Sequence, residues 1–158
     1  SVNVSPETLS SPEGAEALLH ILRSDGIDHQ RIHLEVVETA FLSADSRVTA
    51  TMLALADLGC GWYVDDFGTG FSSLSHLRDL PISGLKLDKS FTQGLARGDE
   101  RSLHVADGLA GLAHGLDLDT VAEGVEHEQE AETLLGLGWR SAQGWLFGRA
   151  APLALAQG

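Results

Sequence analysis

One stretch of the chain decides the fold: residues 63–74 read YVDDFGTGFSSL. An apolar run ends there in the adjacent carboxylates Asp65 and Asp66, and a turn with two glycines and a helix-capping serine follow. Carboxylates at the carboxyl-terminal tip of a buried strand are where α/β proteins hold metals and substrates. The two acids would also serve as plain turn caps, but adjacent carboxylates lose their water only beside a cation. The stretch therefore predicts an α/β domain with a divalent metal at a strand end.

Size and composition fit one α/β domain over residues 1–158. Hydrophobic residues make up 43% of the 158, enough for one core, and 18 glycines supply many tight turns. The one cysteine, Cys60, excludes an internal disulfide and fits a reducing compartment. We expect a cytoplasmic protein, because no apolar run reaches the ~18 residues of a membrane span and no signal-peptide pattern opens the chain.

The net charge of −13 limits the ligands. Polymeric nucleic acid is not expected as a partner, because the chain has no stripe of lysine and arginine to neutralise many phosphates. A small phosphate-containing ligand stays open as an alternative. Such a ligand would need metal ions to offset repulsion by the protein's own charge.

Strand-like and helix-like segments alternate along the chain. We expect strands at residues 2–4, 32–37, 61–65, 85–88, 120–123 and 142–147. Helices are expected between them at about 11–26, 45–59, 72–80, 103–115 and 126–136, with a loop at 90–98. Strands separated by helices predict a parallel sheet.

Polar residues recur on or near these strands: Asn3, Glu35, Asp65, Lys86, Asp88, Glu123 and Gln143. In a barrel of alternating strands and helices, the strand ends meet at one mouth, where the chemistry lies. Side-chain alternation puts Lys86 and Asp88 on one face, and the apolar neighbours of Lys86 argue against a solvated edge-strand lysine. Acids, an amide and a lysine around one mouth are the equipment of metal-assisted phosphoester hydrolysis.

Six motifs resemble those of the EAL domain, a bacterial phosphodiesterase domain that linearises cyclic-di-GMP. They are VNVS at 2–5, LEVVET at 34–39, VDDFGTGFSSL at 64–74, LKLDKSF at 85–91, VAEGVE at 121–126 and QGWLFG at 143–148. Any one of them alone is weak, since Asp-Phe-Gly also occurs in kinases. All six occur in the family's order and cover nearly the whole chain, so chance is a poor explanation.

The resemblance implies a site for one or two Mg²⁺ or Mn²⁺ ions, held by Asn3, Glu35, Asp65 and Asp66. Two catalytic groups are implied beside the metals. Lys86 would orient the attacking water and stabilise charge on the phosphoryl oxygens, and Glu123 would hold a metal or its bound water. Four further residues would contact the ligand or support the site: Glu38, Asp88, Glu126 and Gln143. Of these, Glu38 would anchor the loop at 66–73.

The family's name motif, Glu-Ala-Leu on an early strand, is missing from its expected place. Glu16, Ala17 and Leu18 spell it, but they lie on the predicted helix at 11–26, so we treat this match as coincidence. The motif and its metal-binding glutamate are expected upstream of Ser1. A full barrel takes roughly 250 residues, so we expect a partial (β/α)8 TIM-type barrel with about six of its eight βα units, lacking the N-terminal ones.

Two functions from different classes stay open. The first is a metal-dependent phosphodiesterase that hydrolyses cyclic-di-GMP to linear pGpG in bacterial second-messenger signalling, and the retained site residues favour it. The second is a non-catalytic EAL-like module that binds cyclic-di-GMP or a protein partner, and the missing glutamate favours it, since this stretch alone could be inactive. The resemblance also implies a homodimer and upstream sensory or cyclase domains, with any membrane attachment of the parent protein lying outside this stretch.

Overall fold

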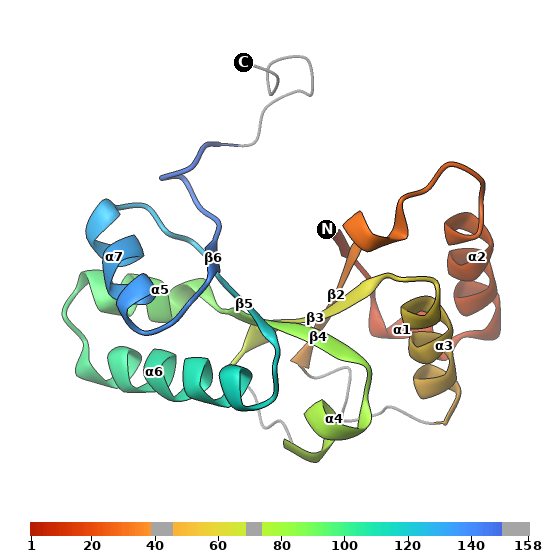
Figure 1. The fold of residues 1–158 in the computed structure, drawn as a ribbon, viewed down its shortest axis with the longest axis horizontal. Coiled ribbons are helices and arrows are strands. Elements are labelled where there is room, and N and C mark those ends of the chain that lie inside the picture. The colour runs from red at the N-terminus through yellow and green to blue at the C-terminus, as the bar shows by residue number, and fades with distance from the viewer. Residues whose placement is uncertain (39–45, 69–73, 150–158) are drawn as a thin grey trace.

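The computed structural model describes residues 1–38, 46–68 and 74–149 of the chain. Within these ranges, six strands form one sheet in the order of the sequence, and every neighbouring pair is parallel (Figure 1). The strands are β1 (Val2–Asn3), β2 (His33–Val37), β3 (Gly61–Phe67), β4 (Ile82–Leu87), β5 (Asp119–Ala122) and β6 (Ser141–Ala142). The predicted α/β fold with a parallel sheet is confirmed.

Helices connect successive strands. They are α1 (Pro6–Ser10), α2 (Pro12–Leu22), α3 (Ser46–Asp57), α4 (Leu74–Asp79), α5 (Lys89–Ala96), α6 (Glu100–Gly115) and α7 (Glu128–Gly136), with a 3₁₀ turn at His29–Arg31. Figure 1 shows α1, α2 and α3 gathered beside one part of the sheet and α5, α6 and α7 beside the other. Among the helices described, none is both long enough and apolar enough to cross a bilayer.

The structure corrects the prediction of a loop at residues 90–98, because helix α5 covers most of this segment. Asp88 caps the helix: its Oδ1 accepts a hydrogen bond from the Ser90 backbone amide at 3.1 Å. A side-chain oxygen at this position satisfies an amide that would otherwise lack a partner in the first turn. The sequence analysis assigned Asp88 to the fourth strand, and it therefore did not predict that Asp88 also caps a helix.

The sixth strand is also shorter than the predicted 142–147. After β6 the chain turns back at Gly144, so that the Leu146 amide bonds to the Val125 carbonyl at 3.0 Å instead of extending the ladder. A side chain at Gly144 would lie 2.1 Å from that same carbonyl oxygen, so only glycine allows this close approach. Helix α1 is an addition to the predicted set, while residues 45 and 72–73 of the predicted helices lie outside the described ranges.

Alternation along the strands divides the sheet into an apolar and a polar face. The apolar face packs against the helices through two clusters, to which the strands contribute Leu34, Val36, Trp62, Val64, Leu85, Leu87 and Ala122. Trp62 is fully buried and its indole donates a hydrogen bond to the Met52 carbonyl in α3 at 3.0 Å, which fixes this helix on the sheet. The residues between them on each strand face the other way and carry the candidate site.

Candidate active site

Lys86 lies at the centre of the polar face with three carboxylates around it. Its Nζ is 2.8 Å from Glu35 Oε2 on β2, 2.9 Å from Asp65 Oδ1 on β3, and 2.5 Å from Glu123 Oε1 after β5. Only 3% of Lys86 is exposed. Burial alone lowers the pKa of Lys86, but its hydrogen bonds to the three carboxylates outweigh this effect and raise the pKa above the ordinary value. The side chain therefore carries a fixed positive charge.

A bulge in β3 places both adjacent acids at this centre. Val64 pairs with Leu85 and Phe67 with Leu87, so Asp65 and Asp66 together stand opposite the single residue Lys86. Asp66 has a φ of +54°, in the left-handed region that aspartate tolerates better than most residues. In a regular strand the two carboxylates would point to opposite faces. The bulge is what lets them serve one site.

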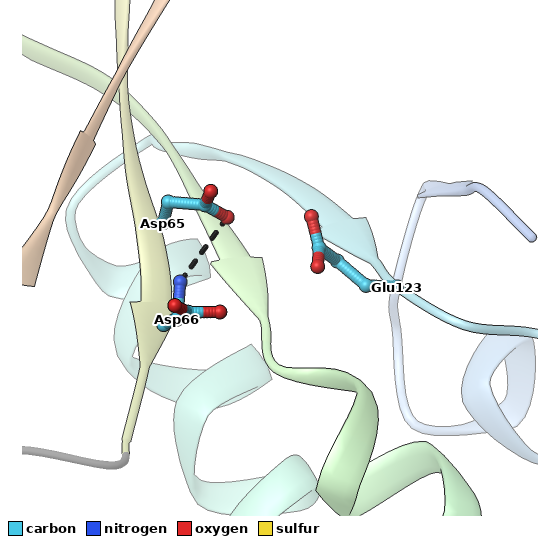
Figure 2. A group of neighbouring side chains, drawn as sticks. All are labelled: Asp65, Asp66 and Glu123. Atoms are coloured by element: carbon cyan, nitrogen blue, oxygen red, sulfur yellow. Dashed lines mark hydrogen bonds between the residues drawn. The ribbon is translucent and has the colours of Figure 1, made fainter. Parts of the chain in front are cut away.

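One carboxylate oxygen from each of Asp65, Asp66 and Glu123 lies within 4.8 Å of the other two (Figure 2). Figure 2 shows the side chains of Asp65 on β3 and Glu123 after β5 pointing toward each other across β4, with Asp66 below Asp65. Oxygen ligands at this spacing are what Mg²⁺ and Mn²⁺ use. Among the described residues this is the one cluster of side chains with such spacing, and it fits a hard divalent cation.

Charge balance points the same way. Glu35, Asp65, Asp66 and Glu123 supply four carboxylates against the single ammonium of Lys86, which leaves three surplus negative charges when all are ionised. Burial, then the charges of Asp65 and Asp88, raise the pKa of Asp66, and burial raises the pKa of Glu123. Lys86 lowers the pKa of both groups but does not offset burial and the like charges around them. A divalent ion would supply what Lys86 cannot.

Three of the other predicted residues lie beside this centre. The side chain of Gln143 donates a hydrogen bond to Glu123 Oε1 at 2.8 Å, and Asp88 raises the pKa of Asp66 through its charge. Asn3 on β1 is the register partner of Glu35 on β2, so its exposed side chain stands next to that carboxylate. The structure thus brings together residues from all six strands or from the segments that follow them.

Glu38 and Glu126 are placed differently. Glu38 is buried, and its Oε2 accepts a hydrogen bond from the Gly68 amide at 3.2 Å, at the start of the loop it is predicted to anchor. Residues 69–73 of that loop lie outside the described ranges. Glu126 is exposed and lines a separate cavity of about 290 Å³ with Lys89 and Trp145, so it stands outside the cluster on Lys86.

One supporting residue is absent from the sequence-based set. Glu130 is buried, and its Oε2 accepts hydrogen bonds from the amides of Glu126 at 2.7 Å and His127 at 3.1 Å. These bonds hold the turn between Glu123 and α7. The sequence carried a signal for this role, because Glu130 comes three positions after the N-cap residue His127, which is the spacing of a capping box.

Comparison with known proteins decides the family. The sequence model of the EAL domain matches residues 1–150. The chain belongs to the EAL domain family. Solved structures of the family confirm the fold. This chain superimposes on the MucR phosphodiesterase in complex with c-di-GMP with a TM-score of 0.89 and 33% identity. The match covers 98% of this chain and 62% of that one. The prediction of a partial TIM-type barrel is therefore confirmed.

Two further relatives carry named ligands or activities. The cyclic di-GMP phosphodiesterase RocR of Pseudomonas aeruginosa is 36% identical over 150 residues, which is 95% of this EAL domain and 38% of RocR. BlrP1 of Klebsiella pneumoniae, solved as a manganese and cyclic-di-GMP complex, has a TM-score of 0.78 and 26% identity over 93% of this chain and 38% of its own. The chain spans only 20% of another relative, from Azorhizobium caulinodans, so its curated relatives are much longer.

Proposed function

We propose that this EAL domain is a metal-dependent phosphodiesterase that hydrolyses cyclic-di-GMP to linear pGpG in bacterial second-messenger signalling. The observation that carries the proposal is the convergence of Glu35, Asp65 and Glu123 on Lys86 beside the oxygen cluster that fits a divalent cation. The activity of RocR and the ligands of the MucR and BlrP1 structures support this substrate and this type of metal. We place the domain in the cytoplasm, which a single reduced Cys60 fits.

The proposed metal ligands are Asn3, Glu35, Asp65 and Asp66. One or two Mg²⁺ or Mn²⁺ ions held there would supply a water of lowered pKa and a polarised phosphoryl group. Burial and the neighbouring carboxylates raise the pKa of Asp66, and a cation held there would favour its ionised form. Glu38, through its bond to Gly68, would keep the bulge and the loop after it in place.

Lys86 and Glu123 are the proposed catalytic residues. The Lys86 ammonium, which the three carboxylates hold in place, would stabilise through its charge the negative charge that builds up on the phosphoryl oxygens. Glu123, whose pKa burial raises and whose orientation Gln143 fixes, would accept the proton of the attacking water. The water oxygen bonds to phosphorus as one bond to a 3′ oxygen breaks, and that leaving oxygen takes up a proton. Asp88 and Glu126 would contact the ligand at the rim.

A second candidate is a module that binds cyclic-di-GMP or a protein without turning it over. One observation favours it: the only Glu-Ala-Leu triplet of the described residues lies on α2, where Glu16 is exposed beside Arg23 and Arg47, away from the site. No strand of this stretch therefore carries the family's name motif. The homodimer and the additional sensory or cyclase domains stay predictions.

The test is turnover of cyclic-di-GMP with Mn²⁺, followed by chromatography of pGpG, on the wild type, Asp65→Asn and the control Asp107→Asn. Asp107 is exposed on α6, so its variant makes the same chemical change away from the site. Turnover that survives in Asp107→Asn and disappears in Asp65→Asn supports the enzyme. A folded wild type that binds the nucleotide without producing pGpG rejects catalysis by this chain and supports the binding module.

A further inference from the structure

The only tyrosine of the chain, Tyr63, lies on strand β3, whose end carries two of the cluster's carboxylates. It precedes Asp65 by two positions on β3, so both side chains point to the polar face. In the register of the sheet its neighbours are Glu35 on β2 and Gly84 on β4. Only 5% of Tyr63 is exposed. The proposed reaction assigns no role to this buried residue.

The ring of Tyr63 occupies space that two glycines leave open. A Cβ at Gly84 would lie 2.4, 2.7 and 2.9 Å from three atoms of the ring, and a Cβ at Gly61 would lie 3.3 Å from it. The imidazole of His33 stacks on the ring with centroids 4.5 Å apart. The hydroxyl donates a hydrogen bond to Asp119 Oδ2 at 3.0 Å. Four successive strands thus meet around one ring.

Along β4, the position that the ring covers lies one side-chain layer before the ion pairs of the site. Lys86 follows Gly84 by two positions and points to the same face, so its aliphatic stem begins one side-chain layer beyond the position that the ring covers. Glu35, which receives one of the Lys86 hydrogen bonds, is the ring's neighbour on the other side. A filled space excludes water, and ion pairs without water are stronger and better oriented.

We infer that Tyr63 is a positioning residue for Lys86: its ring closes the space beneath the lysine and keeps the ammonium aimed at Glu35, Asp65 and Glu123. The ring supplies this effect by its volume, and the hydroxyl bond to Asp119 fixes the ring's orientation. Any effect of Tyr63 on phosphoester hydrolysis rests on the proposed function. Its effect on the position of Lys86 is independent of that function.

The chain offers an internal control for a direct test, because its only two lysines are the buried Lys86 and the exposed Lys89. Reductive methylation followed by peptide mass spectrometry gives the rate at Lys86 relative to Lys89 in the same molecule. In the wild type Lys86 is expected to react about a hundredfold more slowly, because methylation needs an accessible, deprotonated amine. Equal rates at the two lysines in the folded wild type would overturn the inference.

Variants separate the ring from the hydroxyl. Tyr63→Ala is expected to raise the relative rate at Lys86 about tenfold or more, whereas Tyr63→Phe, which keeps the ring, should stay within about threefold of the wild type. The new methyl group in Gly84→Ala would push against the ring, so this variant should raise the relative rate at Lys86. Added to Tyr63→Ala, the same substitution should leave the rate unchanged. An unchanged rate in Tyr63→Ala, or an equal rise in Tyr63→Phe, contradicts the role of the ring.

Folding and function are controlled separately. Circular dichroism checks that each variant is folded. If Tyr63→Ala does not fold, a folded Gly84→Ala tests the inference instead. A Lys86 that stays as unreactive in Gly84→Ala as in the wild type would overturn it. With substrate, Tyr63→Ala should lower kcat far more than it changes KM, because the ring lies beneath Lys86 and not at the mouth. Absence of turnover in the wild type rejects the proposed function, while the labelling ratio still tests the placement of Lys86.

Discussion

Removing the one ammonium at the centre of the site should destabilise the fold in a way that pH and metal can reverse. Lys86→Met keeps the length and volume of the aliphatic stem but leaves Glu35, Asp65 and Glu123 without their common partner. Their side chains are only 8%, 16% and 16% exposed, so water replaces the ammonium poorly. Breaking a buried ion pair by removing one partner costs about 3–5 kcal/mol. We expect about 3 kcal/mol near neutral pH, because Glu123, whose pKa is already raised, can take up a proton.

The pH dependence has a definite sign. Burial raises the pKa of Glu123, and Lys86→Met removes the ammonium that lowers it, so the folded variant takes up a proton there more readily and gains stability relative to the wild type as the pH falls. Each proton taken up recovers about 1.4 kcal/mol per pH unit. The difference in free energy of unfolding between wild type and variant should therefore shrink as the pH falls from about 7 to about 5. Urea titrations followed by tryptophan fluorescence measure this difference, since Trp62 and Trp139 are buried.

Metal gives an independent check of the same argument. Mg²⁺ at about 100 times its dissociation constant stabilises a folded protein by about 2.7 kcal/mol. Because the variant has one positive charge fewer at the cluster, Mg²⁺ should stabilise it more than it stabilises the wild type. Lys89→Met, at the exposed lysine, is the matched control and should change stability by less than about 0.5 kcal/mol. A loss below about 1 kcal/mol for Lys86→Met, or a loss independent of pH, would refute the electrostatic reasoning.

Substitutions at Tyr63, Gly144 and Gly108 test the packing of the fold. Burial, then the hydrogen bond and charge of Asp119, raise the pKa of Tyr63 to about 12, so titration of its ultraviolet absorbance should show a midpoint near 12 when folded and about 10 in urea. The roughly 2.7 kcal/mol of stability linked to that shift is present below about pH 10 and is lost as the pH rises through the folded pKa, a loss that Tyr63→Phe should not show. Gly144→Ala should destabilise by about 1–3 kcal/mol in urea titrations, because its Cβ would lie 2.1 Å from the Val125 carbonyl oxygen. Gly108→Ala, with nothing near its Cβ in the middle of α6, should stabilise by up to about 1 kcal/mol, and a loss there would contradict the packing described.

The sequence predicted the sheet well because its signals are local. Apolar runs bounded by glycine and proline mark strands and helices, and alternation between them leaves parallel pairing as the arrangement expected. The errors arose where a residue has two roles. Asp88 ends a strand motif and also caps α5, and the apolar residues after Gln143 suggested a longer strand although Gly144 turns the chain. Such choices depend on contacts with distant segments, which spacing along the chain does not report.

The residue types of the site were likewise determined by the sequence: acids and a lysine on successive strands of a parallel sheet must meet at one edge. Only the tertiary structure decided how they meet. Strand alternation puts Asp65 and Asp66 on opposite faces, and the bulge that brings both opposite Lys86 follows from pairing Phe67 with Leu87 in the core. The ring of Tyr63 fits against the sheet because Gly84, on the neighbouring strand, leaves space for it. The sequence thus determined which groups the site has, and three-dimensional packing decided their geometry, because register and volume are properties of neighbouring strands and not of one segment.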